Sequence, residues 1–280
     1  MKKIQLLLAL GFLLIAGAAS AQVMLALNLQ PGKTYAYSID LDIHSSKGDQ
    51  SVTMEIKSSY DIFVSSVRAD TLLLRCTYSR MAMAMDLGET KFAGDSRSPL
   101  DTTEFTADAM MNRMVHALTG KSFTLKITRE GAVVDVLGVP EMTEAVVADA
   151  GLPEGARENF RTAFTQQFNE RSLAESFTQS FHIYPNKVVK VGDSWNRTFT
   201  NSSSGLSADA IYTVKAIKGD LVYLDIKSDL KMSNSSMQGT QKGDMVLEAA
   251  TGLMRNGSIR QHITGDAEID NTITIIGNIK

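Results

Sequence analysis

The sequence predicts an α+β fold: a curved antiparallel β-sheet or half-barrel supplied by two β-rich halves, with a central helical segment packed on it. Apolar and polar residues alternate through residues 22–98 and again through 184–280, and this period of two indicates strands with one buried face. Helical spacing is confined to residues 104–183, which also contain a β-hairpin. Because the helices are clustered rather than interleaved with single strands, an antiparallel sheet is favoured over a Rossmann or TIM architecture.

The N-terminus has the pattern of a secretory signal peptide. A pair of lysines precedes an apolar run over residues 6–18, and small residues follow at 19–21. We expect cleavage after Ala21 and a periplasmic or secreted product, a single β-rich domain of residues 22–280. Gln22 stands where a lipidated protein would have Cys, and no later apolar run reaches bilayer length. We therefore expect a soluble protein without a stable membrane anchor.

Composition excludes several classes of partner. The formal charge is −3, and removal of the two N-terminal lysines makes it about −5. No basic stripe is present, so nucleic acid is not an expected partner. Cys76 is the only cysteine, and its place in an apolar strand is typical of a small buried side chain rather than a reactive thiol.

The first β-rich half begins with a hairpin. Residues 35–43 and 52–64 each alternate, with Ser58 as the polar interruption on the second apolar face, and Ser45–Gln50 is the predicted turn. A third strand follows from Leu72 to Tyr78. Residues 94–103 are rich in Pro, Ser and Asp and predict a loop.

Three methionines at the end of that third strand are out of phase with it. The apolar face of residues 72–78 lies at even positions, whereas Met81, Met83 and Met85 are at odd ones. Either a bulge near Arg80 reverses the strand, and the methionines pack as ordinary core, or both faces are apolar there. In the second case the flexible thioether side chains would suit a variable apolar ligand. Both interpretations remain open at this point.

The central segment predicts helices at 109–118, 141–150 and 154–181, with a hairpin of 123–127 and 134–136 between the first two. In the longest stretch, Phe160, Phe164 and Phe168 lie one turn apart. A second set, Leu173, Phe177 and Phe181, has the same spacing but a different phase. We therefore expect a kink or two helices, and we expect this phenylalanine-rich stretch to cover the apolar face of the sheet.

The second β-rich half predicts strands that start at Ser194 and continue through residues 212–214, 221–232, 244–248, 253–264 and 267–276. Asp266, Glu268 and Asp270 share one face of the last of these strands. Carboxylates could bind calcium, but the spacing of a calcium loop is missing. We interpret this face as solvated.

No motif in the sequence predicts catalysis. Gly120-Lys121-Ser122 resembles the end of a phosphate-binding loop, but the earlier glycine is replaced by Val115 and a strand follows instead of a helix. No Gly-x-Ser-x-Gly motif is present, and the four histidines are dispersed without zinc-binding spacing. We therefore expect no nucleotide, cofactor or metal, and no enzyme. An active site assembled in space from distant residues stays open.

Several short motifs resemble those of a family of exported bacterial proteins whose domain has no known function. They are Leu27-Asn28-Leu29-Gln30-Pro31-Gly32-Lys33-Thr34-Tyr35, Gly120-Lys121-Ser122-Phe123, Tyr184-Pro185, Val191-Gly192-Asp193-Ser194-Trp195 and Ala250-Thr251-Gly252. The resemblance covers most of the chain after the signal peptide and implies no catalytic residues. The order of strands, helices and strands is also similar to periplasmic lipoprotein carriers, half-barrels whose concave apolar face is covered by helices.

Together these observations predict a periplasmic protein that binds an apolar, amphipathic or lipid-like ligand between sheet and helices. The predicted lining residues are Met81, Met83, Met85, Phe160, Phe164 and Phe168. The alternative is a structural or protein-interaction module of the cell envelope without a ligand cavity. In that case an edge strand or the loop 201–205 would contact an envelope protein.

Overall fold

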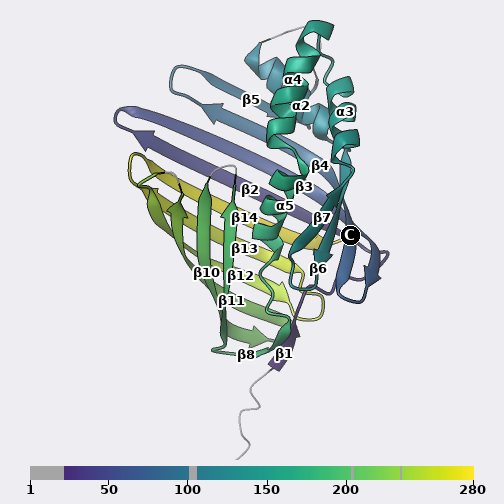
Figure 1. The fold of residues 1–280 in the computed structure, drawn as a ribbon, viewed down its shortest axis with the longest axis vertical. Helices are drawn as coiled ribbons and strands as arrows, with labels where there is room; N and C mark the ends of the chain where they lie inside the picture. Colours follow the sequence, from purple (N-terminus) through teal and green to yellow (C-terminus); the bar gives the residue numbers. More distant parts are fainter. Residues whose placement is uncertain (1–21, 101–105, 203–204, 234) are drawn as a thin grey trace, which may run out of the picture.

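The computed structural model describes residues 22–100, 106–202, 205–233 and 235–280. The predicted signal peptide, residues 1–21, lies outside these ranges, as do parts of the predicted loops at 94–103 and 201–205. Figure 1 shows a broad, strongly curved sheet with helices gathered against one of its faces. The α+β half-barrel predicted from the sequence is confirmed.

Twelve antiparallel strands form the main sheet, in the order β7-β6-β4-β3-β2-β14-β13-β12-β11-β10-β9, with β5 added beside β4. The first half supplies β2 (Thr34–Lys47), β3 (Gln50–Arg68), β4 (Thr71–Asp86), β5 (Lys91–Asp95), β6 (Ser122–Thr128) and β7 (Val133–Leu137). The second half supplies β9 (Ser194–Asn201), β10 (Leu206–Lys218), β11 (Leu221–Met232), β12 (Gln238–Glu248), β13 (Met254–Thr264) and β14 (Glu268–Ile279). A separate two-stranded sheet pairs β1 (Gln22–Leu25) with β8 (Lys187–Lys190).

The two halves of the chain join through β14 and β2. These strands pair from Glu268–Ser46 to Ile279–Tyr35, so the last strand of the second half extends the sheet of the first. The ends of the sheet, β7 and β9, are not paired with each other, and the half-barrel stays open. Two predicted loops are shorter than expected. In the loop predicted at Ser45–Gln50, β2 and β3 remain paired up to a two-residue turn at Gly48 and Asp49. The loop predicted at 94–103 begins later, because β5 extends to Asp95. A positive φ of 58° at Gly48 suits such a tight hairpin.

A bulge in β4 explains the misphased methionines. Ser59 pairs with Arg80 and Tyr60 pairs with Tyr78, which leaves Ser79 as an extra residue. One extra residue reverses the alternation of every side chain that follows. The bulge expected near Arg80 is therefore confirmed, and the methionines that follow continue the buried face of the strand.

Four described helices connect the halves: α2 (Ala107–Leu118), α3 (Val139–Asp149), α4 (Glu154–Gln167) and α5 (Glu170–Phe181). The phase break predicted between 168 and 173 is a break between α4 and α5. Asn169 caps the second helix, with its side-chain oxygen accepting a hydrogen bond from the Ser172 backbone nitrogen at 2.9 Å. A residue at this position satisfies an amide at the helix N-terminus, so the sequence starts a new helix here.

Helix α5 covers the face of the sheet that we call the inner face, the one bearing Tyr37 and Tyr60. Its Phe177 ring lies edge-on to Tyr60 at 5.6 Å and to Phe123 at 5.4 Å. Phe181 meets Tyr37 in the same geometry at 5.5 Å. These edge-to-face contacts are a favoured arrangement of aromatic rings, and they anchor the helix across β2, β3 and β6. The expected cover is confirmed for α5, whereas α4 packs against α3.

Two interior features are the burial of Cys76 and the close approach of β12 to β13. Cys76 is fully buried, and burial raises the pKa of its thiol far above the ordinary value, as expected for a small buried side chain. In β12, a side chain at Gly239 or Gly243 would place its Cβ atom 2.1 Å from the His262 carbonyl oxygen or 2.4 Å from that of Ser258. Only glycine allows β12 to approach β13 this closely.

Candidate functional site: an apolar strip on the inner face

Much of the inner face extends beyond the helix that covers it. The aromatic contacts of α5 reach β2 at Tyr37, and the strand continues for ten more residues to Lys47. At about 3.3 Å per residue, this is roughly 33 Å of strand. Figure 1 shows the hairpins of β2–β3 and β4–β5 projecting past α5.

The side chains on this uncovered part form two apolar rows. Strand register aligns Ile273, Leu41, Ile56 and Met83 in one row across β14, β2, β3 and β4, and Ile43, Met54 and Met85 in the next row. All seven side chains are half-buried. We call them the inner strip. It is a continuous apolar surface formed by residues that face the same side of neighbouring strands.

The three predicted methionines divide between the core and the inner strip. Met81 is 5% exposed and pairs with Ser58 near the covered region, so it belongs to the core. Met83 and Met85 are half-buried and lie opposite Ile56 and Met54. The structure thus brings the methionines together on one face, and two of them reach the open surface.

The three predicted phenylalanines form a separate group on α4. Phe160 and Phe164 stack at 5.9 Å, and Phe164 and Phe168 stack at 4.5 Å. Phe168 also lines a groove of about 580 Å³ whose other walls come from α3, α4 and the start of α5, including Pro140, Thr143 and Thr165. The phenylalanines that contact the sheet are instead Phe177 and Phe181 of α5.

The space directly between α5 and the sheet is filled. Tyr37, Tyr60, Phe177 and Phe181 leave a gap of about 10 Å³ there, the room of about one water molecule. A ligand on the inner face would therefore lie beside α5, over the inner strip.

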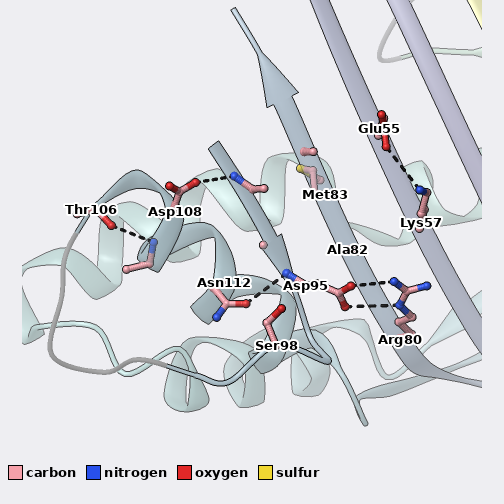
Figure 2. A pocket seen from close by; sticks show the side chains of 14 residues that line it. Glu55, Lys57, Arg80, Ala82, Met83, Asp95, Ser98, Thr106, Asp108 and Asn112 are labelled. Carbon is pink, nitrogen blue, oxygen red and sulfur yellow. Dashed lines mark hydrogen bonds and ion pairs between the residues drawn. The ribbon is translucent and has the colours of Figure 1, made fainter. Parts of the chain in front are cut away.

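A polar pocket of about 610 Å³ lies beside α2 (Figure 2). Most of its strand residues face the outer side of β3, β4 and β5, and Met83 of the inner strip also lines it. Its charged groups are engaged with one another. Arg80 donates to Asp95 through Nη2 at 2.8 Å, and this hydrogen bond lowers the pKa of the Asp95 carboxyl. Lys57 Nζ lies 3.5 Å from Glu55 Oε2.

Helix α2 closes the edge of β5 beside this pocket. The Ala93 backbone nitrogen donates to Asp108 Oδ1 at 2.7 Å, and the Asp95 backbone nitrogen donates to Asn112 Oδ1 at 3.3 Å (Figure 2). Side chains four residues apart on the helix thus match amides two residues apart on the strand. We interpret these contacts as protection of a strand edge.

One group of side chains on the outer face has the composition of a metal site. His262 Nδ1 lies 2.8 Å from Asp270 Oδ1 and 4.0 Å from Glu268 Oε1. Strands β13 and β14 pair His262 with Asp270, and Glu268 lies two residues before Asp270 on the same face. In the sequence the histidine and the carboxylates are separate features, and only strand register brings them together. All three are exposed, and an exposed cluster of this kind is common on solvated strands.

Two parts of the inner face could not be recognised from the sequence. The sequence places Leu41, Ile43 and Ile56 on apolar strand faces and Ile273 within a predicted strand, without any sign that they would stay uncovered. Gln241, Gln261 and Asn271 also occupy inner positions, between apolar or glycine neighbours on β12, β13 and β14. A polar residue in phase with apolar ones was the available signal, for example Gln261 between Ile259 and Ile263.

The fold and the site define an open, curved antiparallel sheet with helices against one face and an uncovered apolar strip on the rest of that face. The chain belongs to the family of unknown function DUF6263, whose model matches residues 69–254, more than half of the chain. No curated protein matches the sequence. Within the described residues, no helix is both long and apolar enough to cross a bilayer.

Among solved structures, the chain is similar to lipovitellin, from a structure concerned with lipid–protein interactions in that protein. The TM-score is 0.53 and the sequence identity 12%. The match covers 90% of this chain and 26% of the lipovitellin chain, so this chain spans about a quarter of that protein's length. At this identity the likeness shows the fold alone.

Proposed function

We propose that this chain is an exported, periplasmic binding protein that holds an apolar or amphipathic ligand on the inner strip, beside α5. The observation that carries the proposal is the strip itself: seven half-buried apolar side chains on adjacent strands, left open by the helices. Contiguous apolar patches on soluble proteins mark sites of interaction. The export signal and the likeness to a lipid-associated sheet support the same assignment.

The inner strip has suitable dimensions and chemistry for an acyl chain. From Ile273 on β14 to Met83 on β4 there are three steps between strands, roughly 14 Å at about 4.8 Å per step. Each methylene group transferred from water onto such a surface contributes up to about 0.8 kcal/mol. Methionine side chains at one end of each row adapt to chains of different shape. Affinity would therefore depend on apolar area rather than on directional bonds.

Two measurements test the proposal. Mass spectrometry of an organic extract of the gently purified protein should detect copurified lipid. A dansylated fatty acid should bind the wild-type protein with increased fluorescence, and Met83→Glu should weaken binding at least about tenfold, because a charge on the strip must be desolvated.

Ala84→Glu is the matched control, since it introduces the same charge one residue away on the outer face of β4. It should bind the probe like the wild type. Equal losses in both variants, or no binding to the wild type, would count against the inner strip. Phe160→Ala in the same assay tests whether the predicted phenylalanines of α4 also line the ligand.

The filled space under α5 favours a second candidate, a protein-interaction module of the cell envelope. Here the strip would contact a protein, or an edge strand such as β9 would accept a strand from a partner. Absence of both copurified lipid and probe binding would favour this candidate over the first.

A further inference from the structure

A ladder of uncharged polar side chains crosses the inner face next to the inner strip. Gln261 Nε2 donates to Gln241 Oε1 at 2.7 Å, and Asn271 Nδ2 donates to Gln261 Oε1 at 3.0 Å. Ser228 lies opposite Gln241 on the next strand. Register places these four residues in a single row across β11, β12, β13 and β14. We call them the amide ladder.

The amide ladder and one row of the inner strip are the two halves of the same line of residues. Asn271 pairs with Ile43, which pairs with Met54, which pairs with Met85. The line is therefore polar over four strands and apolar over the next three. The neighbouring row, through Ile259 and Ile273, is apolar on both sides of this boundary.

The amide ladder is buried at an energetic cost that its own hydrogen bonds do not fully offset. Ser228, Gln241 and Gln261 are 5–7% exposed. Asn271 Oδ1 is inaccessible to solvent and has no hydrogen-bond partner among the described residues. A buried acceptor without a donor costs about 1–3 kcal/mol. Cross-strand pairing of polar side chains explains the two hydrogen bonds between the amide side chains. It does not explain why Asn271 Oδ1, at the end of the ladder beside the inner strip, has no donor among the described residues.

We infer that the amide ladder is a head-group subsite for an uncharged amphiphile that carries a hydroxyl group, such as a monoacylglycerol. This inference rests on the proposed function and specifies its ligand. Asn271 as a whole is half-buried, so a rotation of its side chain brings Oδ1 to the surface. A ligand hydroxyl then donates to Oδ1, while the acyl chain crosses Ile43 and Met54 toward Met85. The row from Ser228 to Met85 contains no charged side chain, so it offers no ion-pair partner for a carboxylate or phosphate head.

The experiment compares two competitors with the same acyl chain, monoolein and methyl oleate, for displacement of the dansylated fatty acid. Only monoolein has hydroxyl groups. Asn271→Leu should weaken monoolein about tenfold, equivalent to about 1.4 kcal/mol, and leave methyl oleate unchanged or tighter. Thr272→Leu, the neighbouring outer-face position on β14, should change neither competitor.

Gln261→Met is the second variant, because it removes both hydrogen bonds of the amide ladder while conserving side-chain length. Circular dichroism verifies that each variant is folded. It should reproduce the selective loss of monoolein. An equal loss of both competitors, or undiminished monoolein binding in both variants, would overturn the head-group subsite while leaving the apolar strip intact. The head-group subsite would also be overturned if the wild-type protein binds the dansylated fatty acid but neither monoolein nor methyl oleate displaces it. Failure of the wild type to bind the probe is the distinct failure of the proposed function.

Discussion

Replacing Phe177 with alanine tests whether α5 is fixed to the inner face or held loosely over it. The Phe177 ring is 6% exposed and contacts Tyr60 of β3 at 5.6 Å, Phe123 of β6 at 5.4 Å and Phe181 of its own helix at 6.0 Å. Phe-to-Ala changes in cores cost about 3–5 kcal/mol, and the cost rises when the surroundings cannot close the cavity.

Two of the three neighbouring rings belong to strands of the main sheet, which cannot move independently to fill the space left by Phe177→Ala. We therefore expect the free energy of unfolding to fall by about 4 kcal/mol. Equilibrium unfolding in urea, followed by far-UV circular dichroism, measures this change.

Phe160→Ala is the matched control for this prediction. Phe160 is half-buried, and among the described residues its aromatic partner is Phe164 on the same helix. Truncation there should cost about 1 kcal/mol, since less apolar area is lost. A loss at Phe177 no larger than that at Phe160 would refute the view that aromatic packing fixes α5 on the sheet.

Two further predictions concern the turn that contacts the end of α5. Gly131 has φ = 89°, and a Cβ atom there would lie 1.6 Å from the Phe181 carbonyl oxygen. Gly131→Ala should therefore lower the free energy of unfolding in urea by about 3 kcal/mol. Gly48→Ala is the control, because a Cβ atom at Gly48 meets open space and the expected loss is about 1 kcal/mol; an equally small loss at Gly131 would contradict the close contact. The pKa of His182 is lowered below 6.5, mainly because the side chain is partly buried and secondly because the charge of Arg197 lies nearby. The carboxylate of Glu130 acts in the opposite direction and raises this pKa. The unfolded chain then binds the extra proton first, so stability falls as pH drops from 6.5 toward the folded-state pKa. His182→Gln should reduce the shift in Tm across this window, and an unchanged shift would exclude His182 as its source.

The strands and helices could be predicted because their patterns are local. The alternation of β2 and β3, the phase break near Asn169 and the turn at Glu130 and Gly131 all depend on neighbours within a few residues. The bulge at Ser79 was also indicated, as a conflict between two runs of alternation in one strand. Its consequence, that the methionines face the inside, required the pairing of β4 with β3.

The candidate site could be predicted only in part, because it depends on which apolar faces remain uncovered. Met83 and Met85 were identified from their unusual phase. The sequence predicts Phe160, Phe164 and Phe168 as lining residues and omits Phe177 and Phe181, although it is α5 that packs across the inner-face aromatics while α4 packs against α3. Helical spacing shows that a helix has an apolar side but not which surface that side will meet.

The sequence by itself determined the class of fold, the order of its elements and the inner and outer faces of most strands, since side-chain alternation follows from backbone geometry. Tertiary structure decided the rest. Pairing of β14 with β2 joined the halves into one open sheet, packing of Phe177 and Phe181 filled one part of the inner face, and strand register aligned Gln241, Gln261 and Asn271 with the inner strip. These outcomes depend on contacts between residues far apart in the chain, and no local pattern in the sequence encodes them.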